Sequence, residues 1–350
     1  MSKKRILFFA EAVTLAHVAR PLALAQALNP DLYDVYLACD PRYNQLFPDL
    51  PFPQRTIHSI PSDRFINALA KGKPLYDTKT LHEYVSEDLA VIEEIAPDLV
   101  VGDFRLSLAV STPLSAVPYM TISNAYWSPY AHQHYPVPEL PLTKILGVGA
   151  GQALFNLVNP VAFALHTIPL NRVRKQYGLA HLGWDLRQIY TWADHTLYAD
   201  IPELAPTYEL PANHHYIGPV LWSPGVSMPD WWGRVPSDKP IIYITLGSSG
   251  RSDLLPALLH TFADLPVTLI AATAGRVTIE KTPGNVFLAD YLPGDAAVAR
   301  SQLVICNGGS PTTQQALTQG IPVLGIPVSY THLRAHETLR SISYAVFCLK

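Results

Sequence analysis

Cysteine is scarce in this 350-residue chain. The three residues Cys39, Cys306 and Cys348 lie far apart and form no Cys-x-x-Cys pair. This excludes a disulfide framework and a thiolate metal site as organising features, and it indicates a reduced, cytoplasmic compartment.

Charge is also sparse. Asp, Glu, Lys and Arg make up 15% of the residues, against about a quarter in an average globular protein. The balance of 25 basic and 28 acidic residues gives a net charge of −3, so the chain has no field that would attract a nucleic acid. The 49% of hydrophobic residues and the length both favour two domains, each with its own core.

Clear membrane and secretion signals are missing as well. Residues 1–23 have a basic start and an apolar run, but Glu11, His17 and Arg20 interrupt it before any suitable cleavage site. Residues 145–171 carry no charge and are long enough to span a bilayer, yet their Asn, Gln, His and Pro residues would be costly in hydrocarbon. We expect helices there that line an apolar pocket or rest on a membrane surface.

Apolar strand-like runs alternate with helical stretches, which predicts an α/β fold with doubly wound parallel sheets. In the first half, strands are expected at 5–10, 33–39, 99–103 and 117–123, with helices at 15–28, 80–95 and 106–115. In the second half, strands are expected at 241–246, 267–272, 286–288, 303–306 and 323–326, with helices at 253–263 and 310–319. The sequence therefore predicts two Rossmann-like domains in tandem.

The predicted domains are residues 1–217 and 241–327. Between them, residues 218–240 are dense in Pro, Gly and Trp, which is typical of a linker. The long charge-poor segment at 126–171 is the candidate for a substrate-facing insertion. Residues 328–350 do not continue the alternation and look like a translated sequencing-adapter tail. We expect a non-native tail and an incomplete second domain; a genuine divergent helix is the alternative.

The turns after the strands indicate the ligand. Residues 10–17 read AEAVTLAH, without a glycine, so the GxGxxG turn of nicotinamide and flavin enzymes is absent. In the second half, Leu246–Gly250 and Asn307–Thr312 are small-residue turns that each follow a strand. Unpaired amides at such a turn or helix start bind anions, which predicts a phosphate site there; ordinary connecting turns are the alternative.

A resemblance to a known family rests on several stretches between Arg5 and Pro327: RILFFA followed by AHVARPLALAQAL, then PDLVVGDFRLSLA, ITLGSSG, ADYLPG and CNGGSPTTQQALTQGIPVLGIP. Together they resemble the GT-B glycosyltransferases that move sugar from a nucleoside diphosphate to small hydrophobic acceptors. The last stretch resembles their donor-binding signature and is the most specific. The resemblance implies an N-terminal acceptor domain and a C-terminal donor domain, with a UDP-sugar as the expected donor.

The resemblance also assigns a catalytic pair, His17 and Asp103. His17 would be the general base on the acceptor hydroxyl, because an alcohol is a weak nucleophile near neutral pH. Asp103 would orient the imidazole and stabilise its charged form. The alternatives are that His17 packs at or caps the first helix, and that Asp103 caps the helix that follows it.

The residues that resemble a donor site lie in the second half. Gly308, Gly309, Ser310 and Thr312 resemble a pyrophosphate cradle, with Ser248 and Ser249 as a second wall. Gln315 stands where these enzymes usually have a ribose-binding glutamate, and Tyr291 where a base-stacking tryptophan is frequent. On the acceptor side, the residues assigned are Asn124, Tyr126 and Trp127.

Three departures from the family pattern concern the donor. Asn307 replaces the usual histidine of the signature, no glutamine follows Pro293, and the Asp-Gln pair expected after Pro327 is absent. The sequence also has no carboxylate pair of the DxD type, so we expect no metal at the diphosphate.

The function predicted is an inverting, UDP-sugar-dependent hexosyltransferase without a cofactor, since the nucleotide sugar is a co-substrate. Its partners would be the nucleotide sugar and a small hydrophobic acceptor, with a peripheral membrane contact as an option. Two alternatives stay open: a non-catalytic homologue that helps a partner transferase, and a nucleotide-sugar epimerase. The sequence does not specify the acceptor, the sugar, the base or the oligomeric state.

Overall fold

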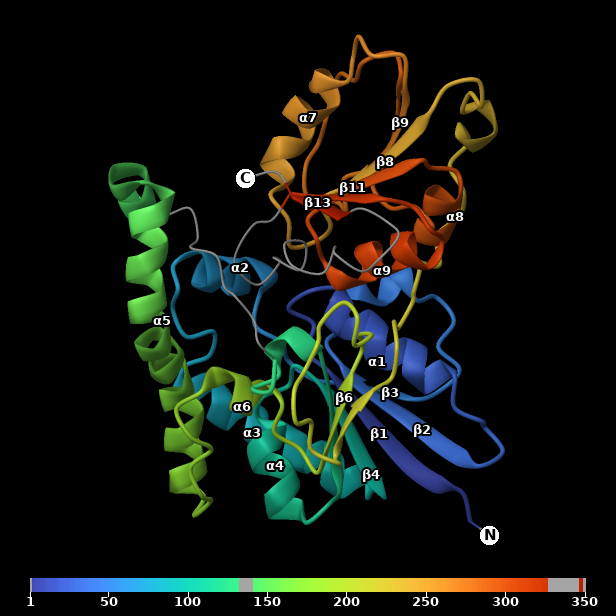
Figure 1. The fold of residues 1–350 in the computed structure, drawn as a ribbon. Coiled ribbons are helices and arrows are strands. Elements are labelled where there is room, and N and C mark those ends of the chain that lie inside the picture. The colour runs from blue at the N-terminus through green and yellow to red at the C-terminus, as the bar shows by residue number, and fades with distance from the viewer. Residues whose placement is uncertain (1, 132–140, 327–345, 349–350) are drawn as a thin grey trace. The chain divides into compact units, whose positions relative to one another are not determined.

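The computed structural model describes residues 2–131, 141–326 and 346–348. The chain divides into two compact units. Unit 1 consists of residues 1–45 and 49–220, and unit 2 of residues 46–48 and 221–350. Each unit contains its own parallel β-sheet (Figure 1).

Among the described residues, unit 1 has a seven-stranded parallel sheet in the order β3-β2-β1-β4-β5-β6-β7. The chain therefore builds outward from β1 in one direction and then from β4 in the other, which is the doubly wound topology expected from the sequence. The strands are β1 (Lys4–Ala10), β2 (Tyr33–Cys39), β3 (Gln54–Thr56), β4 (Leu99–Asp103), β5 (Tyr119–Ser123), β6 (His195–Tyr198) and β7 (His214–Tyr216).

The main helices of unit 1 also agree with the sequence prediction, within about two residues at each end. They are α1 (Ala16–Gln26), α3 (Thr78–Ile95) and α4 (Leu108–Ser115). The sequence analysis missed α2 (Ser62–Ala70), α6 (Leu186–Tyr190) and the strands β3, β6 and β7. The three missed strands are short and polar, so they carry no apolar run.

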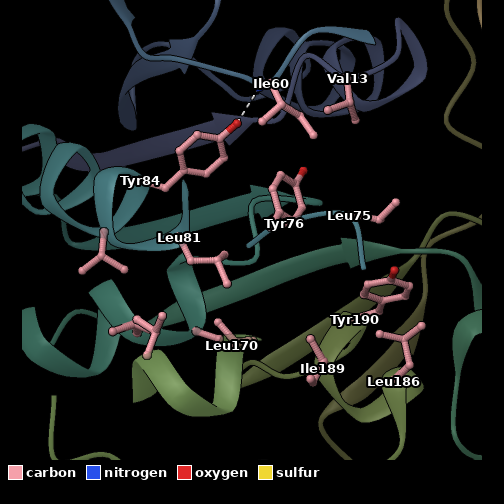
Figure 2. Close-up of a cluster of buried hydrophobic side chains, with 14 of the residues drawn as sticks. Val13, Ile60, Leu75, Tyr76, Leu81, Tyr84, Leu170, Leu186, Ile189 and Tyr190 are labelled. Atoms are coloured by element: carbon pink, nitrogen blue, oxygen red, sulfur yellow. Dashed lines mark hydrogen bonds between the residues drawn. The ribbon is translucent and has the colours of Figure 1, made fainter. Parts of the chain in front are cut away.

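A large apolar core lies between the sheet and helices of unit 1 (Figure 2). Leu81, Val85 and Tyr84 of α3 meet Leu170 and Val173, which come from a later helix. The hydroxyl of Tyr84 accepts a bond from the amide of Ile60 at 2.6 Å, which ties the loop after β3 to this core.

That later helix, α5 (Pro141–Gln176), is the long green helix of Figure 1. It is kinked at Gly147, whose φ of +74° is left-handed and suits glycine. It packs against α3 and α6. The helix expected at 145–171 is therefore confirmed, and residues 132–140 of the predicted insertion lie outside the described residues.

Unit 2 has a six-stranded parallel sheet in the order β10-β9-β8-β11-β12-β13, counting described residues only. Five of these strands were predicted, and the last is a short strand inside the expected tail, most of which lies outside the described residues. The elements are β8 (Ile241–Thr245), α7 (Leu255–Thr261), β9 (Thr268–Ala272), β10 (Val286–Ala289), α8 (Gly294–Ala299), β11 (Leu303–Cys306), α9 (Ser310–Thr318), β12 (Val323–Gly325) and β13 (Val346–Cys348).

The stretch predicted as a linker contributes aromatic side chains to unit 2 from residue 221 onward. The indole N–H of Trp231 donates to the carbonyl of Leu288 at 3.0 Å. Arg300 lies over the ring of Trp232, 5.0 Å from its centroid. Together these contacts hold the segment before β8 against the core of unit 2.

Candidate active site

His17 and Asp103 meet where the sheet of unit 1 changes direction. β1 and β4 are parallel neighbours, and Ala10 at the end of β1 is paired with Asp103 at the end of β4. From β1 the chain continues to one side of the sheet, and from β4 to the other. Ligands of doubly wound sheets bind at the carboxyl ends of the strands at this point. The fold thus brings the two predicted residues together at the expected place.

The imidazole of His17 is hydrogen-bonded to the carboxylate of Asp103. His17 Nδ1 lies 2.7 Å from Asp103 Oδ1. Because a carboxylate only accepts, we assign the proton to Nδ1, which leaves Nε2 unprotonated. Nε2 has no hydrogen-bond partner in the described part of the chain, and the side chain is 18% exposed. Nε2 is therefore able to take a proton from a ligand.

Neither residue caps a helix. Leu15 stands at the N-cap of α1, and Ser107 at that of α4. The capping alternatives considered for His17 and Asp103 are therefore wrong.

Arg20 extends the pair into a buried network. It lies one turn after His17 on α1 and is 4% exposed. Its Nε donates to Asp103 Oδ2 at 2.8 Å and its Nη2 to Asp103 Oδ1 at 2.7 Å, a two-pronged contact that fixes the plane of the carboxylate. Nη1 donates to Asn124 Oδ1 at 3.0 Å, and Asn124 Nδ2 donates to Asp200 at 3.2 Å.

Phe104 covers one face of the imidazole. The rings of Phe104 and His17 are stacked, with centroids 4.5 Å apart and planes at 14°. Phe104 directly follows Asp103 and has a φ of +61°. A bulky residue in this left-handed region is uncommon, and such strain gathers at functional sites. Here the strained backbone places an apolar ring against the base.

The surroundings lower the pKa of His17. Burial of the imidazole has the largest effect, Asp103 opposes it by raising the pKa, and the Arg20 guanidinium lowers it again. A lowered pKa keeps the imidazole neutral near neutral pH. The neutral form is the one that a general base requires.

A second buried network holds the loop between β1 and α1. Arg105 donates to Glu11 at 3.0 Å, to Asp88 at 2.9 Å and to Glu87 at 2.9 Å. Its guanidinium lies 3.6 Å from the ring centroid of Tyr84, whose hydroxyl donates to Glu11 at 3.0 Å. Burial raises the pKa of Glu11 and of Asp88, and Arg105 opposes this. Through Glu11, the network fixes the loop that leads to His17.

The sequence analysis missed Arg20, Phe104 and Arg105 as site residues. Arg20 carried one usable signal, because it follows His17 by three residues and so lies on the same face of the helix. Phe104 and Arg105 flank the predicted Asp103 in sequence. Their roles depend on contacts with residues that are far apart in the chain, so no local pattern reveals them.

The three residues assigned to the acceptor take different positions. Both ends of the Asn124 side-chain amide are used by Arg20 and Asp200, so this residue supports the catalytic pair. Trp127 is in edge contact with Tyr190, with ring centroids 4.9 Å apart, and has Tyr126 beside it at 5.6 Å. Trp127 and Tyr126 thus belong to an aromatic cluster next to Phe104.

In unit 2, the two predicted phosphate-type turns lie side by side. Parallel strands β8 and β11 are neighbours at the switch point of this sheet. Ser248 and Ser249 follow β8, and Asn307 Nδ2 of the turn after β11 lies 3.4 Å from Ser249 Oγ. Asn307 also accepts from the amide of Gly309 at 3.1 Å. Gly308 has a φ of +76°, which favours glycine.

Helix α9 starts directly after this turn. Its N-cap is Gly309, with no side-chain cap, and Ser310, Pro311 and Thr312 form its first turn. Nearby, Gln315 donates through its side-chain nitrogen to the Trp222 carbonyl and to Ser223 Oγ. Its amide oxygen has no hydrogen-bond partner among the described residues. Tyr291 follows β10 and donates to the carbonyl of Ala274 at 3.0 Å.

Sequence similarity to named glycosyltransferases shows the family of this chain. Over 325 residues, the chain is 56% identical to a PGL/p-HBAD biosynthesis glycosyltransferase of Mycobacterium tuberculosis strain H37Ra, a match that covers 93% of this chain and 76% of the relative. The chain belongs to this glycosyltransferase family. A PGL/p-HBAD biosynthesis rhamnosyltransferase of Mycobacterium bovis BCG is 58% identical over 324 residues, covering 93% of this glycosyltransferase and 72% of the relative.

One relative has a different name. An inactive PGL/p-HBAD biosynthesis glycosyltransferase of Mycobacterium bovis BCG is 53% identical over 258 residues, covering 74% of this chain and 70% of the relative. A scan of protein-family models gave no match.

Solved structures support the GT-B fold of this glycosyltransferase. The spinosyn rhamnosyltransferase SpnG matches 99% of this chain and 86% of its own with a TM-score of 0.68, at 19% identity. SpnG complexed with thymidine diphosphate gives a TM-score of 0.67 at 18% identity, covering 99% of this chain and 86% of that one. The expectation of two Rossmann-like sheets in a GT-B enzyme is thus confirmed.

Proposed function

We propose that this glycosyltransferase moves a sugar from a nucleoside diphosphate to a hydroxyl of a small hydrophobic acceptor, with inversion at the anomeric carbon and with His17 as the base. The observation that carries the proposal is the 2.7 Å bond between His17 Nδ1 and Asp103, which leaves Nε2 unprotonated at the switch point of unit 1.

In the proposed step, the acceptor oxygen attacks the anomeric carbon as the bond from that carbon to the diphosphate oxygen breaks. Nε2 of His17 takes the proton of the hydroxyl, and the nucleoside diphosphate leaves with the bonding electron pair. Asp103 stabilises the imidazolium that forms. Arg20 holds Asp103 in plane, while Phe104 restricts the imidazole to one orientation.

Unit 2 is the proposed donor site. Small residues and backbone amides gather at the carboxyl ends of β8 and β11. They come from the turns at Ser248–Ser249 and Asn307–Gly309 and from the start of α9, which has no side-chain cap. Such a site suits a diphosphate, because amides and the helix dipole stabilise negative charge. The Gln315 amide oxygen is the proposed acceptor for a ribose hydroxyl. UDP is the expected nucleotide, and the complex of SpnG with thymidine diphosphate adds that nucleotide to the candidates.

The test is a survey of donors and acceptors. The chain is incubated with UDP-sugars and thymidine-diphosphate sugars, including rhamnosyl donors, and with a set of hydrophobic phenols and alcohols. We expect a glycoside whose anomeric configuration, read by NMR, is opposite to that of the donor. A product with retained configuration would contradict a single displacement.

The alternative of a non-catalytic helper is favoured by one observation, the relative whose name includes "inactive". It predicts no product with any donor, together with a gain in activity when the chain is added to a partner transferase. The same survey therefore separates the two functions.

A further inference from the structure

The outer face of α5 exposes an aliphatic stripe. Leu154 is 37% exposed, Leu157 75%, Val158 48%, Val161 59% and Leu165 53%. Leu157 and Val158 are adjacent, and each lies three or four residues from Leu154 and from Val161, which Leu165 follows by four, so the five side chains lie on one face of the helix. We call these five residues the α5 stripe. From Gly149 onward, α5 is long and apolar enough to cross a membrane, and only 17% of its most apolar 18-residue stretch is buried.

The second half of α5 is attached to unit 1 through its opposite face. Phe163, Leu170 and Val173 are buried in the core of this unit. Asn171 donates to the carbonyl of Gly183 at 3.0 Å and accepts from the amide of Leu182 at 2.9 Å, and Arg174 donates to the carbonyl of Ala180 at 2.7 Å. Between Phe163 and Arg174, α5 is therefore attached to unit 1 along one side and presents its other side to its surroundings.

The charge pattern along the same face suits an anionic surface. No charged residue occurs from position 145 to 171. The face then continues with Arg172 and Lys175, both exposed, seven and ten residues after Leu165. Basic residues beside an apolar helix face are typical of helices that lie in the interface of an anionic membrane.

We propose that the α5 stripe docks on the surface of an anionic lipid bilayer, with Arg172 and Lys175 at the headgroups. The side chains favour lipid over a protein partner, because the stripe contains only Leu and Val. The centres of protein interfaces are instead enriched in Tyr, Trp and Phe.

The position of α5 relative to His17 suggests a role for membrane docking in catalysis. This role rests on the proposed function, whereas the docking itself does not. Phe163 of α5 faces Trp127, with ring centroids 6.5 Å apart, and Trp127 meets Tyr190. Tyr190 lies 5.2 Å from Phe104, which stacks on His17. One helix therefore has lipid-suited residues on its outer face and, on its inner face, the end of an aromatic cluster that reaches the base. An acceptor with an apolar tail could keep that tail in the lipid while its hydroxyl approached His17.

The test measures flotation with vesicles in the absence of donor and acceptor, so that its result is independent of catalysis. The vesicles are phosphatidylcholine with or without about a third of phosphatidylglycerol. We expect the chain to bind the mixed vesicles, and L157E/V161E to bind at least tenfold more weakly. The control L32E changes an apolar residue that is 57% exposed elsewhere on unit 1 and should bind as the unchanged chain does.

A second variant tests the charge. R172E/K175E should weaken binding to the mixed vesicles by about fivefold or more for each residue, and the effect should shrink at high salt. Circular dichroism melts check that each variant folds. If L157E/V161E floats like the unchanged chain, or if the chain forms lipid-free dimers that this variant dissociates, the stripe is not a lipid-docking face.

Discussion

At the scale of single residues, Arg20 sets the properties of the catalytic pair. A histidine beside an aspartate alone would have a raised pKa, because the carboxylate favours the imidazolium. Here the Arg20 Nη2 lies 3.1 Å from His17 Nδ1 and shares the same carboxylate. The cation therefore opposes Asp103, and it adds to burial, which is the largest effect, in lowering the pKa of His17.

This balance predicts the pH dependence of two Arg20 variants. Since the base acts when neutral, the rate falls as the pH falls through the pKa of His17. Arg20→Gln removes the cation and raises that pKa, so the acid limb of kcat/KM should move to higher pH. Arg20→Lys keeps the charge and should leave the limb close to its original position. A purely structural role would lower the rate of both variants at every pH without moving the limb.

At the scale of elements, the loop between β1 and α1 depends on Arg105. Removing one partner of a buried ion pair leaves an uncompensated charge and costs about 3–5 kcal/mol. We expect Arg105→Met to lower the free energy of unfolding by that amount at pH 8, because Glu11 and Asp88 are then buried without a cation. Arg55→Met, which breaks the exposed ion pair with Glu94, should change little.

The sign of the pH effect follows from the raised pKa values of Glu11 and Asp88. A carboxyl whose pKa is higher in the folded state than in the unfolded state makes the folded state relatively more stable at low pH, where the group is protonated and neutral. Loss of Arg105 raises both pKa values further, so the defect of Arg105→Met should shrink between pH 8 and pH 5. Thermal melts across this range measure it. A defect that is constant or grows toward acid pH would contradict the network.

The turn after β8 gives a prediction for the donor side. A Cβ at Gly250 would lie 1.8 Å from the carbonyl oxygen of Leu246, a backbone atom that cannot move aside cheaply. Gly250→Ala should therefore distort the turn that carries Ser248 and Ser249, and it should reduce the thermal shift caused by UDP or thymidine diphosphate. Gly284→Ala is the matched control, because nothing lies within 4 Å of its Cβ. Equal shifts in both variants would argue against this turn as a nucleotide contact.

The helices and strands also show how much of the fold the local sequence predicts. The strands Tyr33–Cys39, Leu99–Asp103 and Leu303–Cys306 were predicted with the bounds that the structure has, because each is a short, largely apolar run. His214–Tyr216 was missed because it is polar and lies at the sheet edge. His17 and Asp103 could be predicted because both stand at strand ends. Arg20 is 83 residues from Asp103, and only the fold brings the two together.

At the scale of the whole molecule, each unit has predicted residues at the switch point of its own sheet: His17 and Asp103 in unit 1, and the turns after β8 and β11 in unit 2. No group of three or more metal-ligating side chains occurs among the described residues. In the proposed donor site, backbone amides and the start of α9 neutralise the diphosphate in place of a cation. Activity should therefore persist in EDTA. A requirement for added Mg²⁺ or Mn²⁺ that follows its occupancy would contradict the proposed cradle.

The central claim is that His17 takes the acceptor proton. Its most direct test is single-turnover transfer by the His17→Ala variant, with nucleotide binding followed in parallel by thermal shift. We predict a rate about 10²- to 10⁴-fold lower, the usual contribution of a general base, and an unchanged thermal shift with nucleotide. Transfer to a hydroxyl acceptor at a near-normal rate would contradict the claim.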